Sequence, residues 1–302
     1  MPPPPLSTEA NWKIPASFWL AALFWGTSFL WIKIGLENWD PVSLVTFRLG
    51  VASLFFAATL LASRQKFRVF LPGSWILPLV AFLNPYVPFL LISWAEQSID
   101  TGMAAVLNAT VPLFTLLLAP LFLPDEKPTW QTTLGALIGF SGIVILFGVP
   151  RLEMLSEMKG QFAVILACLC YALSTILLRR YGPNQPAIVQ AALINVLALA
   201  WVFAHGLLIG GLKMPPGSWN WMAVGWLGAL GSFAAYSLAM YVFVRRGATY
   251  MSFTNLAYPL LGVLLGIVVL GEPFEWRIVG GGTLVIGGIA LVQLQKVRRA
   301  RK

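Results

Sequence analysis

The stretch NATVPLFTLLLAPLFL at residues 108–123 returns in altered form as NLAYPLLGVLLGIVVL at residues 255–270. Both stretches begin with Asn, carry Pro four residues later and continue as an apolar run, so Pro112 corresponds to Pro259 under a shift of 147 residues. The match extends outward at nearly the same shift, where SGIVIL at residues 141–146 corresponds to GGIALV. The chain is therefore an internal duplication.

The composition indicates that this duplicated chain lies in a membrane. Of its 302 residues, 58% are hydrophobic and 10% are charged, with a mean hydropathy of +0.80, whereas a soluble domain carries charge on about a quarter of its residues. This excludes a water-soluble globular enzyme. The apolar runs suit transmembrane helices of about 20 residues and lack the period-two alternation of a membrane barrel. They predict an all-α polytopic membrane protein with ten transmembrane helices, at residues 14–34, 41–62, 76–94, 102–123, 132–149, 162–178, 187–212, 219–244, 251–270 and 278–294.

Each copy of the duplication contains five of these helices. Because five is odd, the second copy enters the membrane from the opposite face, and the two copies form an inverted repeat. Inverted repeats that meet at the membrane midplane are typical of secondary transporters that work by alternating access. The expected organisation is a cytoplasmic tail at 1–13, a first five-helix repeat at 14–149, an inter-repeat loop at 150–161, a second repeat at 162–294 and a basic cytoplasmic tail at 295–302.

The basic residues predict the orientation, because Lys and Arg in short loops stay on the cytoplasmic side. With the N-terminus inside, the inner segments hold 14 of the 20 basic residues and the outer loops hold four. The sequence pI near 9.8 then reflects orientation in the membrane and not nucleic-acid binding. We expect a multi-pass protein of the cell (inner) membrane with both termini in the cytoplasm.

Three blocks of sequence together resemble a known family. They are WGTSFLWIKIGL at residues 25–36, PVSLVTFRL at 41–49, and the long block at 102–146 whose second-half counterpart ends LGEPFEWRIVGGGTLVIGGIAL. Their order and their doubling resemble the EamA-type members of the drug/metabolite transporter superfamily. The resemblance implies a ten-helix inner-membrane carrier of small metabolites, often amino acids and often moved outward. It does not identify the substrate.

Each repeat places an Asn–Pro pair near the middle of the membrane. A proline inside a helix leaves the carbonyl four residues earlier without its hydrogen-bond donor, which here is the carbonyl of Asn108 for Pro112 and of Asn255 for Pro259. Hydrocarbon cannot satisfy these groups. We expect both asparagines to line a central substrate cavity and both prolines to act as hinges. The alternative is that Ser or Thr hydroxyls and neighbouring helices satisfy the carbonyls and that the prolines only bend the helices.

The third span and its counterpart are also interrupted. LNPYVPF at residues 83–89 contains two prolines, and the counterpart contains Gly231 and Ser232, so both helices are expected to bend, with Pro85 as a further hinge. Aromatic and small polar side chains at paired positions are typical of small-molecule pockets, although each can instead be an ordinary packing residue. The remaining candidates for substrate binding are Trp25, Ser28, Asn84, Tyr86, Tyr171, Ser174, Tyr236 and Tyr258.

Arg48, Glu96 and His205 are candidates for coupling or for an internal ion pair, because ionisable residues within membrane spans are often functional. Arg48 lies two turns into its span, where a guanidinium needs carbonyls, a carboxylate or a substrate anion. Glu96 lies at the outer end of span three, and His205 in the outer part of span seven favours packing over proton relay. The midplane contains no Asp or Glu. Facilitated transport, exchange and proton coupling therefore all stay open, and a strongly cationic substrate is disfavoured.

Other functions fit the sequence less well than metabolite export does. A multidrug efflux carrier is the nearest alternative. A membrane-embedded lipid-modifying enzyme needs clustered catalytic or metal-binding side chains, which one His and the neighbouring Cys168 and Cys170 do not supply, and a channel needs charge rings. We expect no catalytic residue, metal or cofactor, and the expected partners are a small-molecule substrate and the lipid bilayer. The glycines of spans five and ten favour packing within the chain, with a weak homodimer as the alternative.

Overall fold

The computed structural model describes residues 12–63, 71–123, 130–147, 155–214, 218–239, 241–242 and 257–300. Over these ranges the regular structure is helical and contains no strand. In the first half the elements are α1 (Lys13–Leu36), α2 (Pro41–Ser63), η1 (Ser74–Ile76), α3 (Leu77–Ala81), η2 (Phe82–Tyr86), α4 (Val87–Ala95), α5 (Thr101–Asn108), α6 (Val111–Phe122) and α7 (Trp130–Phe147). In the second half they are α8 (Leu155–Tyr181), α9 (Ala187–Leu208), α10 (Ser218–Gly225), η4 (Trp226–Ala234), α12 (Ala257–Leu270) and α13 (Trp276–Ala300).

Each of the ten apolar stretches predicted to cross the membrane contains helix in its described residues, although the stretch at 102–123 is divided into α5 and α6 and the stretch at 187–212 is helical only to Leu208. Seven of the described helical segments are long and apolar enough for a crossing, and they are Lys13–Leu36, Pro41–Ser63, Ser74–Ala95, Thr101–Phe122, Ser156–Tyr181, Ala187–Leu208 and Trp221–Ala239. Three further apolar helices are shorter, at Thr133–Leu146, Tyr258–Leu270 and Trp276–Leu291. The all-helical architecture is confirmed over the described residues, where seven helices are long and apolar enough to cross a membrane.

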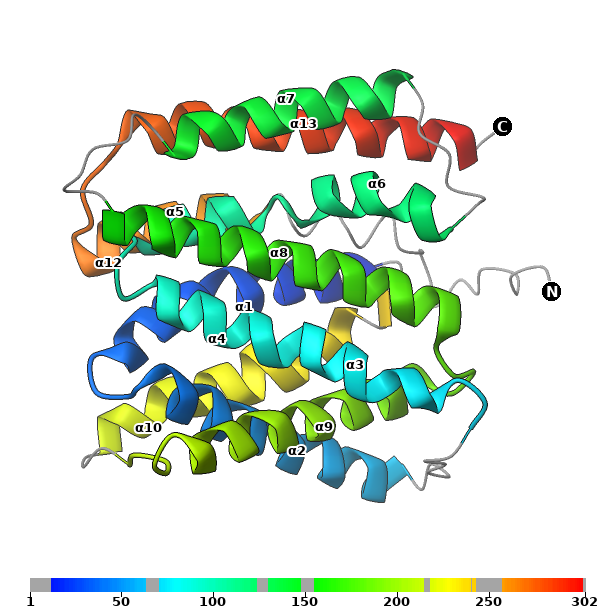
Figure 1. Cartoon of the computed structure of the whole chain (residues 1–302), viewed down its shortest axis with the longest axis vertical. Helices are drawn as coiled ribbons and strands as arrows, with labels where there is room; N and C mark the ends of the chain where they lie inside the picture. Colours follow the sequence, from blue (N-terminus) through cyan, green and yellow to red (C-terminus); the bar gives the residue numbers. More distant parts are fainter. Residues whose placement is uncertain are drawn as a thin grey trace.

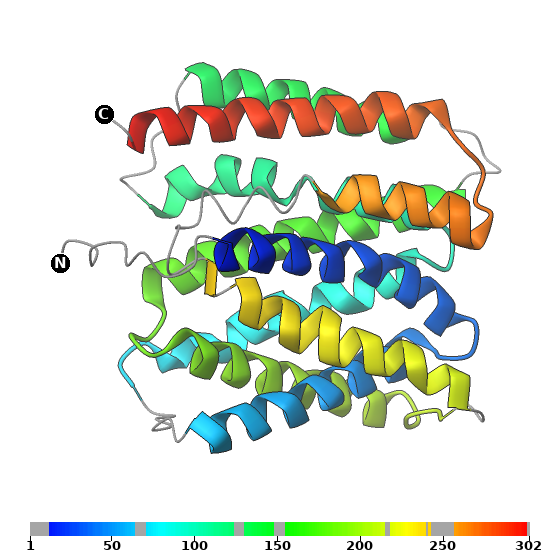
Figure 2. The same cartoon turned by 180° about the vertical axis from the view of Figure 1, so that it is seen from behind.

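Corresponding helices of the two halves run in opposite directions. In Figure 1, α1 runs from right to left and its counterpart α8 from left to right, and α7 and α13 are opposed in the same way. Figure 2 shows the same opposition from behind. The packing also repeats. α1 contacts α12 and η4 in the other half, and its counterpart α8 contacts α6 and α4, which correspond to α12 and η4. Two contacts join an element to its own counterpart, namely α2 to α9 and α5 to α12. An inverted duplication predicts this exchange of contacts.

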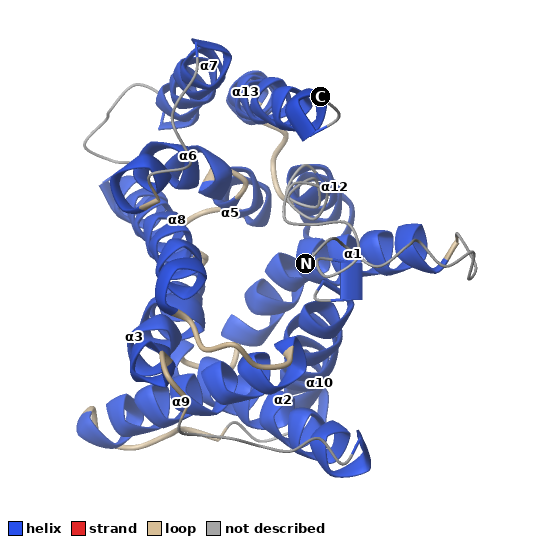
Figure 3. Ribbon diagram, turned by 90° about the vertical axis from the view of Figure 1, so that its right-hand side faces the viewer, coloured by secondary structure: helices blue, strands red, loops and turns tan. Residues whose placement is uncertain are grey.

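Glycines bring α7 and α13 into backbone contact at one edge of the bundle, far from α2 and α9 (Figure 3). A Cβ atom on Gly142 would lie 2.6 Å from the carbonyl oxygen of Gly281, and one on Gly288 would collide with the carbonyl of Gly135. Glycine permits this approach because it has no side chain. Gly139, Gly142, Gly281 and Gly288 therefore pack within one chain, as the sequence predicts, whereas a Cβ atom on Gly280 or Gly287 would meet nothing within 4 Å. The weak homodimer stays a prediction.

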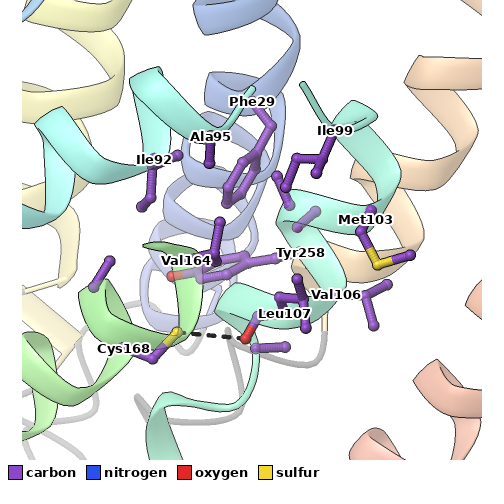
Figure 4. Packing of buried hydrophobic residues seen from close by; sticks show 14 of the residues in the cluster. Phe29, Ile92, Ala95, Ile99, Met103, Val106, Leu107, Val164, Cys168 and Tyr258 are labelled. Carbon is purple, nitrogen blue, oxygen red and sulfur yellow. Dashed lines mark hydrogen bonds between the residues drawn. The ribbon is translucent and has the colours of Figure 1, made fainter. Parts of the chain in front are cut away.

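The largest buried cluster lies where α1, α4, α5, α8 and α12 meet. Figure 4 shows Phe29, Ile92, Leu107, Val164 and Tyr258, one from each of these helices, packed around a common centre. In a bilayer such contacts stabilise a protein through close van der Waals packing, because lipid tails are as apolar as the side chains. The cluster fixes the end of α5 against α8 and so positions Asn108.

Candidate functional site

Spans three and eight are both interrupted halfway along their length, at corresponding positions. The π-helical η2 interrupts span three, where the backbone of Asn84 is extended (φ −166°, ψ 112°) next to Pro85. Span eight is π-helical throughout η4, which contains Gly231 and Ser232. A kink is present in span three at Asn84, whereas span eight changes from α-helical to π-helical over η4 without a residue of non-helical backbone. π-Helical turns occur frequently at functional sites, and these two lie in the same region of the bundle.

Span four is broken, and not merely bent, at its Asn–Pro pair. α5 ends at Asn108, and Pro112 lies in the first turn of α6, where a missing N–H breaks no helical bond. The Cys168 thiol donates a hydrogen bond to the carbonyl of Leu107 at 3.4 Å and lies 3.8 Å from the carbonyl oxygen of Asn108 (Figure 4). The sequence leaves open Ser or Thr hydroxyls and neighbouring helices as partners of the Asn108 carbonyl, and here the neighbouring helix α8 provides a thiol. Asn108 itself is half-buried.

The corresponding pair in span nine is described only in part. Pro259 is buried near the start of α12. Asn255 lies outside the described residues. Tyr258, one residue before the proline, is buried within the large apolar cluster (Figure 4).

Aromatic and amide side chains from both halves meet around Trp25 of α1. The Trp25 ring packs edge to face against Tyr236, with ring centroids 5.5 Å apart, and against Tyr258 at 6.0 Å. The Tyr236 hydroxyl donates a hydrogen bond to Oδ1 of Asn84 at 3.1 Å. Four of the predicted substrate-binding residues are thus joined in one set of contacts, although they come from different spans.

Arg48 belongs to the same region. Its side chain is 3% exposed, its Nε donates a hydrogen bond to Oγ of Ser232 at 2.9 Å, and its Cζ lies 3.6 Å from the centroid of the Phe89 ring. Its electrostatic neighbours include Tyr236, which contacts Asn84. We call the group Trp25, Arg48, Asn84, Ser232 and Tyr236 the central network. The sequence predicts Arg48 as a candidate for coupling or an ion pair, separate from the substrate-binding residues, and the structure places its guanidinium next to them.

Ser232 and Phe89 are the two contacts that sequence reasoning missed. Both lie in stretches that were singled out for bending and not for their side chains. The sequence feature that could have identified Ser232 and Phe89 is their position in the two interrupted spans. A hydrogen bond between residues 48 and 232 depends on how two distant helices pack, and no pattern in the sequence reports that packing.

The two predicted serines make hydrogen bonds within their own helices. The hydroxyl of Ser28 donates to the carbonyl of Phe24 at 2.7 Å, and that of Ser174 donates to the carbonyl of Tyr171 at 3.1 Å. Ser28 nevertheless borders the central network. Its Oγ would lie 2.7 Å from a Cβ atom on Gly231, which directly precedes Ser232 of that network. Tyr171 is an electrostatic neighbour of Arg48.

Tyr86 and His205 form a separate pair. The Tyr86 hydroxyl lies 3.1 Å from Nδ1 of His205, and the two rings are perpendicular. This contact joins η2 to α9. It gives the Tyr86 hydroxyl and Nδ1 of His205 a partner within the protein, as the packing role that the sequence favours for His205 requires.

Acidic side chains collect at the end of the bundle where α4 ends and α5 and α13 begin, which we call the acidic end. The Glu272 carboxylate accepts hydrogen bonds from the backbone N–H groups of Thr101 at 2.8 Å and Gly102 at 3.4 Å, and so joins the second half to the first. A helix N-terminus favours such a carboxylate. Burial, followed by the Glu272 charge, raises the pKa of Asp100 above its usual range.

Next to these residues lies a cavity of about 160 Å³, lined by Ser98, Ile99, Asp100, Met103, Glu157, Glu275, Arg277 and Ile278. Arg277 forms ion pairs with Glu157 and Glu275 across it. Glu96 is fully buried close by, and no described residue donates a hydrogen bond to its carboxylate. Lys33 instead donates to the backbone carbonyl of Glu96 at 2.6 Å.

Two stretches of the chain, residues 14–148 and 158–294, each match the EamA-like transporter family. The chain belongs to this family. Together the two matches cover most of the chain, and they divide it into the two halves described above. This EamA protein is a transporter and not an enzyme.

Curated relatives agree with the family. The chain is 30% identical over 293 residues to the "Uncharacterized inner membrane transporter YedA" of Escherichia coli K12, covering 91% of this chain and 88% of the relative. It is 25% identical to the "Probable terminal-alkyne amino-acid exporter" of Streptantibioticus cattleyicolor, covering 96% and 97%. A crystallised protein with 20% identity has the same fold, with a TM-score of 0.67 over 97% of this EamA transporter and 100% of that chain.

Proposed function

We propose that this EamA transporter is a secondary transporter that exports small metabolites, above all amino acids or related compounds, by alternating access. The observation that carries this proposal is the central network, in which side chains from two oppositely directed halves meet at interrupted helices. Such a seam suits a site that two equivalent halves expose in turn. The amino-acid exporter among its relatives supports the substrate class.

We further propose ten transmembrane helices in the inner membrane, with both termini in the cytoplasm. α1 begins and α13 ends at the same end of the bundle (Figure 1), and the basic residues Arg179 and Arg180 lie at that end too. The rule that basic residues stay inside makes this end cytoplasmic and the acidic end external. Of the shorter helices, α7 has 18 residues, which span about 27 Å and nearly match a hydrocarbon core of about 30 Å.

In this proposal the acidic end is closed and the contacts there open during transport. Glu272 ties the loop before α13 to the N-terminus of α5, and Lys33 ties α1 to the end of α4. Each contact joins two elements at the acidic end. We propose that both contacts break when the external face opens, and Asn108 and Asn255 remain proposed lining residues of the substrate cavity.

Counterflow in proteoliposomes tests the function. Vesicles loaded with an unlabelled amino acid should take up the labelled form transiently, and Trp25→Ala or Asn84→Ala should lower the initial rate at least about tenfold. Trp19→Ala is the matched control, because Trp19 lies in the same helix but is 64% exposed on the outside of the bundle. Equal transport rates for the Trp25 and Trp19 variants would show that the central network is not the substrate site. If none of the twenty amino acids supports counterflow, amino acids are not the substrates of this transporter.

A further inference from the structure

Arg48 is a buried cation without a charged partner. Over the described residues, its guanidinium makes one hydrogen bond, from Nε to Ser232, and no carboxylate forms an ion pair with it. A guanidinium has five N–H donors, so four remain for another group. Burying an unpaired charge is costly, and a substrate anion that binds next to Arg48 would offset this cost.

The two contacts that Arg48 does make orient its planar group. The bond to Ser232 fixes the Nε edge, and the Phe89 ring lies against its face with Cζ 3.6 Å from the ring centroid. This leaves the terminal Nη edge unbound. A Cβ atom on Gly231 would lie 3.7 Å from Nη2 of Arg48. Because Gly231 has no side chain, space remains beside the Nη edge of the guanidinium.

The surroundings of Arg48 connect this edge to the proposed substrate site. Tyr171 and Tyr236 are its electrostatic neighbours, and the Tyr236 ring packs against Trp25. The acidic neighbour Glu96 does not serve as its partner, because no described residue, Arg48 included, donates to the Glu96 carboxylate. The free edge therefore belongs to the central network and lacks a protein anion.

We propose that Arg48 binds the carboxylate of the substrate, so that the transporter takes compounds with one free carboxylate. This inference rests on the proposed transport function and on the central network as its site. Two parallel N–H···O bonds from the Nη edge match the two oxygens of a carboxylate. One guanidinium among aromatic rings suits a single negative charge better than a phosphate dianion, and the rings of Trp25 and Tyr236 suit an ammonium group on the same molecule.

The test compares acids with their amides. Purified wild-type protein is titrated with each of the twenty amino acids, the carboxamide of each, and 4-methylpentanoate as a carboxylate without an amine, while the melting temperature is followed. We expect amino acids that stabilise the protein to bind at least about tenfold more tightly than their amides, since tenfold corresponds to about 1.4 kcal/mol. Arg48→Gln should abolish this preference by weakening acid binding and leaving amide binding unchanged.

Two further variants separate recognition from folding. Arg48→Lys keeps the charge but loses the paired donors, and Ser232→Ala keeps Arg48 but frees its Nε edge. Both should retain the unliganded melting temperature more closely than Arg48→Gln and should show a reduced preference for acid over amide. If Arg48→Gln does not fold, these two variants test whether Arg48 binds the substrate carboxylate.

The outcomes distinguish the two proposals. Counterflow with equal acid and amide affinities in wild type, or equal losses of both in the Arg48 variants, would overturn the role of Arg48 and leave transport intact. Binding of 4-methylpentanoate alone, lost in Arg48→Gln, would support the carboxylate site and overturn the amino-acid substrate. If no carboxylate binds at all, both proposals fail.

Discussion

At the scale of single residues, the central feature is that polar groups freed by broken helices find specific partners. The break at Asn108 and Pro112 frees carbonyls, and a thiol from another helix reaches them. Cys168 is fully buried and also packs in the large apolar cluster. Its contact with the carbonyls follows from its position opposite the break, which only the packing of α5 against α8 reveals.

Replacing Cys168 by Ala should lower the thermal stability of the protein. The substitution removes the thiol that lies 3.4 Å from the Leu107 carbonyl oxygen and 3.8 Å from that of Asn108. The Leu107 carbonyl keeps its bonds from the backbone N–H and the hydroxyl of Thr110. The loss therefore falls on the half-buried Asn108 carbonyl and should reach no more than the lower part of the about 1–3 kcal/mol that an unsatisfied buried acceptor costs. Cys168→Ser, which retains a donor, should lose less. Thermal unfolding in detergent measures both effects.

Cys170 provides the control for that experiment. It lies on the same helix and is only partly buried, so Cys170→Ala should leave the melting temperature nearly unchanged. If Cys168→Ala is as stable as Cys170→Ala, the thiol does not support the broken helix.

At the scale of elements, the helices, their order and their interruptions could be predicted from the sequence. Apolar length predicts helices, and Pro85, Pro112 and Gly231 mark where three of them are interrupted. The severity of the interruption at Pro112 was not predictable, because whether a helix bends or breaks depends on partners in neighbouring helices. The bond from Arg48 to Ser232 was not predictable for the same reason, since it joins side chains 184 residues apart.

The glycines of α7 and α13 give the sharpest prediction at this scale. Gly142→Ala should force the two helices apart, because the new methyl group would meet the carbonyl oxygen of Gly281 at 2.6 Å. Such overpacking costs about 1–3 kcal/mol. The melting temperature in detergent should fall accordingly.

Gly280→Ala makes the same substitution in α13, at a position that does not contact α7. A Cβ atom there meets nothing within 4 Å, and Ala is favoured over Gly within a helix by about 0.5–1 kcal/mol. This variant should be neutral or slightly stabilised. A stability loss equal to that of Gly142→Ala would mean that the contact between α7 and α13 is not the cause.

At the scale of the whole molecule, the acidic end joins the two halves. The Glu272 carboxylate holds the first N–H groups of α5 although it comes from the other half of the chain. Glu272→Gln should weaken these bonds, since it removes the charge that strengthens them. Hydrogen exchange at Thr101 and Gly102 should become faster, whereas Glu37→Gln, at an exposed position of the same end, should not change it.

Stability should also depend on pH through Asp100. Burial and the Glu272 charge raise the pKa of Asp100, while Lys33 opposes them and Glu275 and Glu157 add to them. A carboxyl with a raised folded-state pKa holds its proton more tightly when folded. Its contribution to stability is therefore present below the unfolded-state pKa, about 3.9, and is lost as pH rises through the raised folded-state value.

Asp100→Asn removes this titration. The variant should match wild type near pH 4 and melt at a higher temperature than wild type at pH 7.5, as measured by thermal unfolding at both values. Glu37→Gln again serves as the control and should leave the difference between the two pH values unaltered. A parallel shift of the Asp100→Asn curve at both pH values would contradict the assignment.

The opposed directions of the two halves have a consequence for insertion into the bilayer. Every helix carries a dipole from its N- to its C-terminus, and the counterparts α1 and α8, or α7 and α13, point opposite ways (Figure 1). The dipoles within each of these two pairs oppose one another, so the four helices add little net dipole along the direction in which they run. In the proposed topology the difference between the two membrane faces then rests mainly on charged side chains, and moving a few lysines and arginines from one end of the bundle to the other should reverse the orientation of the protein in the membrane.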